Sequence, residues 1–301
     1  VDAIVWKPVR GGADTPIVNL VEVADSFGTN SVDSWGAADT GQAWTTAGGA
    51  AADYDKAAGV GTIALPDTAA ARNVIQDTVN LGAVEVRGTF TVPQTATGAS
   101  YQCHLMARRV DGSNFYLLSA AADTAGNIDV DILRNLAGVF TARATVANAF
   151  TYSPGDTIGL VFRLVGVRLL GKAWNATTGS EPAGWTIEAL DTAFSTGAVG
   201  VRSQRVVGNT NVGLIIAWDN FSASTVGVKV DDYEFAPNVS NTYRVTAKDD
   251  GLVRTDIETT SITPNLTATW LKSVARPFLN QTVKLLGNTF AIEREERGAA
   301  F

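Results

Sequence analysis

The chain has 301 residues, of which 46% are hydrophobic and 18% charged, a balance that supports a buried core and excludes wholesale disorder. Its net charge of -7 and pI of about 4.8 argue against nucleic acid or anionic lipid as a partner, because both would repel an acidic protein. A single cysteine, Cys103, excludes an intrachain disulfide, and no apolar run approaches the roughly 18 residues of a membrane span.

The first residues differ in character from the rest. Residues 1–21 contain Gly11-Gly12 and two prolines, and they predict an extended N-terminal arm outside the core. Residues 22–240 predict the main domain, which ends where Ala236 to Asn241 close the series of strands. Residues 241–301 then form a small C-terminal segment of mixed structure.

Short segments with alternating apolar and polar residues fill the main domain, and turn-forming residues separate them. They are residues 83–92, 100–110, 114–122, 126–134, 139–146, 157–165, 167–174, 198–203, 212–218 and 226–235. Gly112 and Gly166 each lie between two such segments and predict hairpins. The pattern predicts an all-β, antiparallel, jelly-roll-like sandwich.

A helical period occurs in the C-terminal segment. Apolar residues recur from Leu266 to Phe278 at helical spacing, and Pro277 would end the element. We therefore expect a short helix there.

Candidates for catalysis are few. His104 is the chain's one histidine and neighbours the one cysteine, Cys103. The chain therefore has too few His and Cys residues for a zinc site and no motif for a nucleophile–histidine pair. Asp129 and Asp131 share one face of a predicted strand, about 6.6–7 Å apart, which is a spacing that glycoside hydrolysis can use. The glutamates that flank such a pair in jelly-roll glucanases are missing, so an amphipathic strand with both carboxylates outward is the favoured interpretation, and no enzyme activity is expected.

The sequence leaves two kinds of binding site possible, one for calcium and one for a sugar. Asp25, Asp231 and Asp232 would form a weak calcium site if the first and last strands of the domain pair, although no calcium motif is present and no cofactor is otherwise expected. Exposed tryptophan could stack on sugar rings, whereas buried tryptophan would belong to the core. The candidates within the sandwich are Trp35, Trp44, Trp174, Trp185 and Trp218.

Several stretches resemble a known module. They are Asp25-Ser26-Phe27-Gly28, Ser34 to Trp44, Val167 to Trp174, Glu181 to Trp185, Gly197 to Arg202 and Val230 to Phe235. They resemble concanavalin A/laminin-G-like jelly-roll modules of actinobacterial and actinobacteriophage proteins. The likeness spans residues 22–240 and is weak for any activity.

The C-terminal residues extend the resemblance. Trp270 to Asn280 and Ile292 to Phe301 are similar to a segment that follows such modules in minor tail proteins of long-tailed actinobacteriophages. In those proteins the segment opens a further domain, which leaves truncation or processing after Phe301 open.

The resemblance implies a structural and adhesion component of a phage tail tip. Such a protein would be a virion component assembled in the host cytoplasm, where a chain without disulfides is stable. It would act in tail assembly and attachment to host-surface glycan, as a homo-oligomer, often a trimer, beside other tail-tip proteins. The alternatives are a carbohydrate-binding module of a secreted bacterial protein and a jelly-roll glycosidase.

Overall fold

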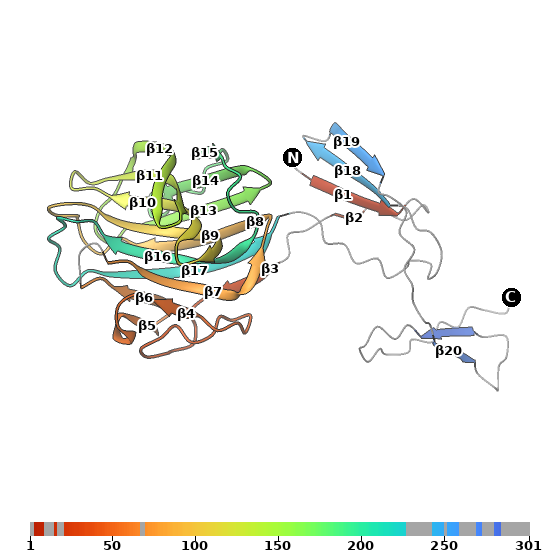
Figure 1. Cartoon of the computed structure of the whole chain (residues 1–301), viewed down its shortest axis with the longest axis horizontal. Coiled ribbons are helices and arrows are strands. Elements are labelled where there is room, and N and C mark those ends of the chain that lie inside the picture. Colours follow the sequence, from red (N-terminus) through yellow and green to blue (C-terminus); the bar gives the residue numbers. More distant parts are fainter. Residues whose placement is uncertain are drawn as a thin grey trace. The chain divides into compact units, whose positions relative to one another are not determined.

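The computed structural model describes residues 3–8, 15–16, 21–66, 70–226, 243–249, 252–258, 269–272 and 280–283 (Figure 1). Contacts divide the chain into two units, which are residues 18–228 and residues 1–17 together with 229–301. Within the described residues no helix is long and apolar enough to cross a membrane.

The larger unit is a sandwich of two antiparallel sheets, which confirms the predicted all-β jelly-roll class. One sheet has seven strands in the order β12-β11-β10-β9-β16-β7-β4. Their bounds are β4 Thr45–Ala47, β7 Arg72–Leu81, β9 Tyr101–Asp111, β10 Asn114–Ala122, β11 Asn127–Leu136, β12 Val139–Thr151 and β16 Gly197–Arg205.

The second sheet has eight strands in the order β15-β14-β13-β8-β17-β6-β5, with β3 also pairing β17. Their bounds are β3 Val21–Asp25, β5 Tyr54–Ala57, β6 Val60–Ala64, β8 Val84–Thr91, β13 Thr157–Val165, β14 Arg168–Asn175, β15 Ile187–Leu190 and β17 Ile215–Thr225. A single 3-10 turn, Ala51–Asp53, precedes β5 among the described residues.

The two predicted hairpins are confirmed. Gly112 lies between β9 and β10, and Gly166 lies between β13 and β14 with a φ of 56°. A positive φ costs glycine little because it has no Cβ, so the chain can reverse tightly at Gly166.

Alternation along β11 shows how sequence determines the two faces of a strand. Ile128, Val130 and Ile132 are fully buried in the core between the sheets, while Asp129 and Asp131 lie on the opposite face. Burying each aliphatic side chain contributes about 1.5–3 kcal/mol. This gain fixes the register, because a slip of one residue would place both carboxylates in the core.

The smaller unit shows how part of the predicted N-terminal arm is paired. β1 (Ala3–Pro8) pairs with β18 (Tyr243–Asp249) in a sheet that also holds β2 (Thr15–Pro16) and β19 (Leu252–Glu258). An extended segment has backbone N–H and C=O groups that need partners, and pairing with β18 supplies them. Residues 3–8 of the predicted arm are therefore extended, and they share a sheet with described residues of the C-terminal segment.

The predicted helix is wrong for its described part. Thr269–Lys272 forms strand β20, which pairs with β21 (Asn280–Val283). Threonine and tryptophan both favour extended structure, and strand pairing outweighs the short helical period here. The rest of the predicted helix lies outside the described residues.

Candidate functional site

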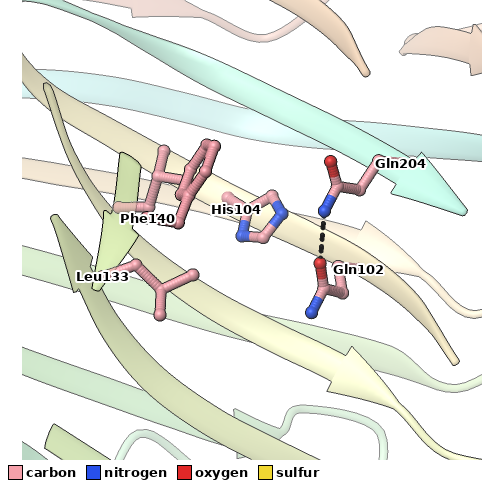
Figure 2. A pocket seen from close by; sticks show the side chains of 6 residues that line it. Gln102, His104, Leu133, Phe140 and Gln204 are labelled. Carbon is pink, nitrogen blue, oxygen red and sulfur yellow. Dashed lines mark hydrogen bonds between the residues drawn. The ribbon is translucent and has the colours of Figure 1, made fainter. Parts of the chain in front are cut away.

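A pocket of about 280 Å³ lies on the seven-stranded sheet (Figure 2). Adjacent strands β9, β10, β11, β12 and β16 supply its walls. The lining residues are Gln102, His104, Leu117, Leu133, Phe140 and Gln204.

Strand alternation places these side chains on the face turned away from the core. Cys103 and Leu105 on β9 belong to the core, so Gln102 and His104 point to the other face. The register then aligns Gln204 of β16 directly opposite Gln102.

This face of the sheet lies on the inside of a curve. Phe140 and Arg202 are four strand steps apart, from β12 to β16, which would separate their backbones by about 19 Å in a flat sheet. The Arg202 guanidinium nevertheless lies 5.3 Å from the centre of the Phe140 ring. The β11–β12 hairpin therefore curls over the face and brings Phe140 into the pocket wall.

His104 lies in this pocket without a hydrogen-bond partner. Its side chain is 0% exposed, and neither Nδ1 nor Nε2 makes a hydrogen bond. Burial, with a further contribution from the charge of Arg202, holds the pKa of His104 well below its ordinary value, so the ring is neutral. The hydroxyl of Ser119, opposite His104 on β10, is buried and unpartnered as well.

A directed chain of hydrogen bonds runs along the other side of the pocket. Arg202 donates from Nη2 to Oε1 of Gln204 at 2.7 Å, and Gln204 donates from Nε2 to Oε1 of Gln102. A guanidinium can only donate, so it fixes the orientation of both amides. The chain therefore ends on the Nε2 amide hydrogens of Gln102 (Figure 2).

The predicted tryptophans divide into two groups. Trp35, Trp44 and Trp218 are buried core residues with 0%, 7% and 1% exposure. The indole N–H of each finds an acceptor inside the protein, namely the carbonyl of Thr62, the carboxylate of Asp25 and the hydroxyl of Ser203. The expectation that these three could stack on a sugar at the surface is therefore corrected.

Trp174 and Trp185 are half-buried. Trp174 lies against Gly159 of the neighbouring strand β13. Trp185 contacts two cations, with Arg163 at 5.0 Å and Lys172 at 5.1 Å from its ring centre. Both stay predictions as sugar-stacking residues, and neither lines the pocket on the seven-stranded sheet.

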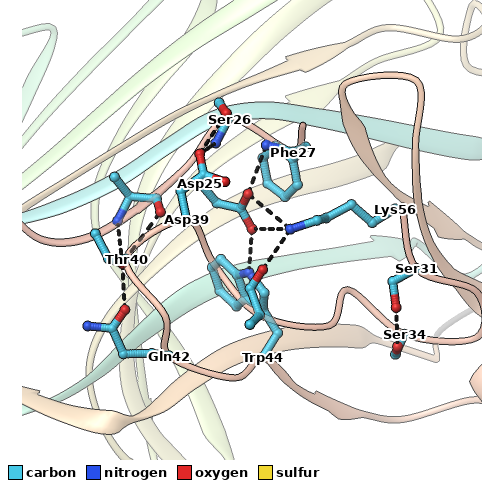
Figure 3. Close-up of polar contacts among 12 residues, drawn as sticks. Asp25, Ser26, Phe27, Ser31, Ser34, Asp39, Thr40, Gln42, Trp44 and Lys56 are labelled. Carbon is cyan, nitrogen blue, oxygen red and sulfur yellow. Dashed lines mark hydrogen bonds and ion pairs between the residues drawn. The ribbon is translucent and has the colours of Figure 1, made fainter. Parts of the chain in front are cut away.

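Asp25 occupies a buried ion pair (Figure 3). Its two carboxylate oxygens accept hydrogen bonds from Lys56, the Trp44 indole and the Phe27 backbone N–H. The Lys56 ammonium stands where a calcium ion would have to bind, so the calcium prediction is wrong for Asp25. Asp231 and Asp232 lie outside the described residues.

No metal site emerges from the described part of the chain. There, no three His, Cys, Asp or Glu side chains gather in a way that could hold a metal ion.

Asp129 and Asp131 lie on the pocket's face of the sheet without lining the pocket. Asp129 accepts a 2.7 Å hydrogen bond from the Asn148 N–H, and Asp131 accepts a 2.6 Å bond from the Thr145 hydroxyl. Burial and the nearby Asp129 charge raise the pKa of Asp131, against the effect of the Thr145 bond. Strand β12 thus engages both carboxylates.

Sequence reasoning missed Gln102, Phe140, Arg202 and Gln204 as site residues. Gln102 and His104 share a face by alternation, which the sequence already indicates. The other three join them only through pairing of β9 with β16 and through the curl of β12, and no local signal specifies either of these.

Comparisons with known proteins give structural likeness only. No protein-family model and no curated protein matches the chain. A carbohydrate-binding module, CBM66 from Bacillus subtilis, matches with 17% identity and a TM-score of 0.42 over 60% of this chain and 94% of that chain. A β-glucanase from Bacillus licheniformis matches with 11% identity and a TM-score of 0.47 over 68% and 97%. Basic winged bean lectin matches with 12% identity and a TM-score of 0.42 over 60% and 91%.

Proposed function

We propose that this chain is a non-catalytic carbohydrate-binding module that holds a saccharide in the pocket of the seven-stranded sheet. The observation that carries the proposal is the combination of apolar surface with unsatisfied polar groups inside one concave site. Leu117, Leu133 and Phe140 supply the apolar surface, and Gln102, Gln204 and His104 supply polar groups, of which the two His104 nitrogens have no partner.

A sugar ring suits this combination chemically. Its C–H faces are apolar, and its hydroxyls both donate and accept hydrogen bonds. Phe140 is 46% exposed and can cover a ring face, while the Nε2 group of Gln102 can donate to a hydroxyl. The neutral His104 ring carries one donor and one acceptor, but it is 0% exposed, so it reaches a sugar only when a neighbouring side chain moves. Small-molecule sites typically combine an apolar lining with a few polar groups that fix orientation.

Binding is favoured over hydrolysis by the lining of the pocket. Hydrolysis of a glycosidic bond generally uses two carboxyl groups that flank it. None of the six lining residues is an Asp or Glu, and Asp129 and Asp131 are engaged by β12. The glycosidase alternative would need both of these carboxylates to turn toward the pocket.

A place for the module at a phage tail tip rests on the sequence resemblance alone. It would make the pocket a host-attachment site, presented in several copies by an oligomer beside other tail-tip proteins. Mass measurement of the purified chain and antibody labelling of assembled particles test these two parts. A monomer and unlabelled particles would favour the module of a secreted bacterial protein.

The binding proposal is tested with a glycan array followed by titration of the best saccharide. Phe140→Ala should weaken binding about tenfold or more, because it removes apolar cover from the sugar. Trp185→Ala, on the other sheet, is the matched control and should leave affinity unchanged. Loss of binding in the Trp185 variant alone would place the site on the eight-stranded sheet and overturn the proposal.

A further inference from the structure

A cation without a carboxylate partner lies beside the pocket, against two of the residues that line it. Arg202 of β16 makes hydrogen bonds to the neutral side chains Asn73 and Gln204, and its Nε is buried without a partner. Within the described residues, no carboxylate forms an ion pair with it. Desolvation alone lowers its pKa to about 10, with no acidic neighbour to oppose the shift.

The buried arginines Arg72 and Arg108 have other kinds of partner. Arg72 pairs with Asp53 at 2.7 Å, and Arg108 donates to the carbonyl oxygens of Gly82, Gly166 and Phe194. Arg202 instead lies against the Phe140 ring and beside Gln204, which both line the pocket. Its internal partners are thus neutral amides and aromatic rings, and its charge lies at the edge of the pocket.

Hydrogen-bond donors of the pocket lie near the positive charge of Arg202. The amide chain from Arg202 ends on the N–H₂ of Gln102, and His104 is neutral, with both nitrogens buried and without a partner. Strand pairing aligns Arg202 with His104, Ser119 and then Asp131, three strands away. Asp131 is the first carboxylate in this row, and it accepts a hydrogen bond from Thr145. The site is thus electropositive and rich in donors, which suits an oxyanion.

We propose, building on the carbohydrate-binding function above, that the saccharide is acidic and that Arg202 recognises its carboxylate. Gln102 and His104 hydrogen-bond the same sugar, and Phe140 covers its apolar face. The carboxylate supplies the counterion that the folded chain lacks. A planar guanidinium matches a carboxylate in two parallel hydrogen bonds, which a neutral sugar cannot reproduce.

The test uses the full chain and an array of paired saccharides. The pairs are galacturonate and galactose oligomers, glucuronate-containing and glucose oligomers, and sialylated and unsialylated lactose, with sulfated sugars included. The best acidic sugar is then titrated calorimetrically beside its methyl ester, which keeps the ring and removes the charge. We expect the acid to bind about 10- to 100-fold more tightly than the ester, as a charge-assisted hydrogen-bond pair predicts.

Variants assign this preference to Arg202. Arg202→Gln should abolish the difference between acid and ester, whereas Arg168→Gln, which alters an exposed ion pair on the other sheet, should keep it. Circular dichroism checks that both variants fold. If Arg202→Gln does not fold, the comparison of acid with ester in the wild-type chain decides alone.

The outcomes separate this inference from the function on which it rests. Equal binding of acid and ester, or an unchanged preference in Arg202→Gln, overturns the acidic ligand while leaving a neutral saccharide site intact. Equal binding of sulfated and carboxylated sugars overturns the carboxylate assignment. Binding of no saccharide at all overturns both proposals.

Discussion

Lys56 lies inside the sandwich with its Nζ 3.0 Å from Oδ2 of Asp25, and both side chains are shielded from solvent. Lys56 also donates to the carbonyl of Ala37 at 2.7 Å, and Trp44 donates to the same Asp25 oxygen. The pair connects the end of β3 with β5 and with the loop between them (Figure 3). It is a structural centre, because every bond it makes is internal.

Removing one member of this pair should destabilise the fold strongly. Lys56→Met leaves the Asp25 carboxylate buried without its cation, which costs about 3–5 kcal/mol. Urea denaturation measures the loss in the free energy of unfolding. The control is Arg168→Met, which disrupts an exposed ion pair and should cost under about 1 kcal/mol. A loss of similar size in both variants would contradict the structural role of the pair.

The sequence predicted the strands better than the site. β10 and β13 match their predicted bounds at both ends, and the turns around Gly112 and Gly166 mark one end of each strand. The strands from β3 to β7 were not predicted, since most are short and the burial pattern of β7 is irregular. Flanking turn residues therefore located β10 and β13, which are buried on both faces, better than alternation did.

The candidate site was harder to predict for two physical reasons. Alternation groups residues on a face but does not say which strands become neighbours, so Gln102 could not be joined to Gln204 across a hundred residues of chain. Composition likewise does not separate buried from exposed tryptophan. Trp44 and Trp218 are buried because Asp25 and Ser203 accept their indole N–H groups, and those partners are distant in sequence.

A methyl group at Gly159 should displace Trp174. A Cβ at this position would lie 2.3 Å from Cζ2 of the indole, so Gly159→Ala forces the ring away and should cost about 1–3 kcal/mol. Tryptophan fluorescence and thermal unfolding measure the two effects. Gly112→Ala is the control, because its added Cβ would meet nothing within 4 Å. An unchanged emission spectrum in Gly159→Ala would mean that Trp174 does not contact β13 in solution.

The charge of Asp131 should destabilise the folded chain slightly at neutral pH. The raised pKa of Asp131 means that folding favours its protonated form, so its contribution to stability is lost as pH rises through the folded pKa. Asp131→Asn keeps the acceptor for Thr145 and removes the charge. It should therefore gain stability relative to wild type at pH 7 but not at pH 3, by a fraction of a kcal/mol after solvent screening.

Saccharide affinity measured on the same variant tests the hydrolytic alternative. Asp131→Asn should bind the array's best saccharide as the wild-type chain does, and neither protein should release reducing sugar from it. Hydrolysis by the wild-type chain that disappears in the variant would establish a glycosidase and contradict the binding module.

The buried His104 ring should destabilise the folded chain while contributing to saccharide binding. Its ring nitrogens are buried without partners, which is a desolvation cost that Leu, of similar volume, avoids. His104→Leu should therefore raise the free energy of unfolding by about 1–2 kcal/mol at pH 8 while weakening saccharide binding. Ser119→Ala removes the neighbouring unpartnered hydroxyl and is the matched control.

The pH dependence separates the two variants. The pKa of His104 is well below 6.5 in the folded chain, so below pH of about 6.5 the unfolded chain binds one more proton than the folded chain at this residue. The free energy of unfolding therefore decreases as pH falls below about 6.5, with a slope approaching about 1.4 kcal/mol per pH unit.

Because His104 is the only histidine of the chain, the stability difference between His104→Leu and wild type should widen from pH 8 to pH 5. Ser119→Ala should follow the wild-type slope. If the difference stays constant over this range, His104 is protonated equally in the folded and unfolded chains, and a neutral donor–acceptor ring in the pocket is excluded.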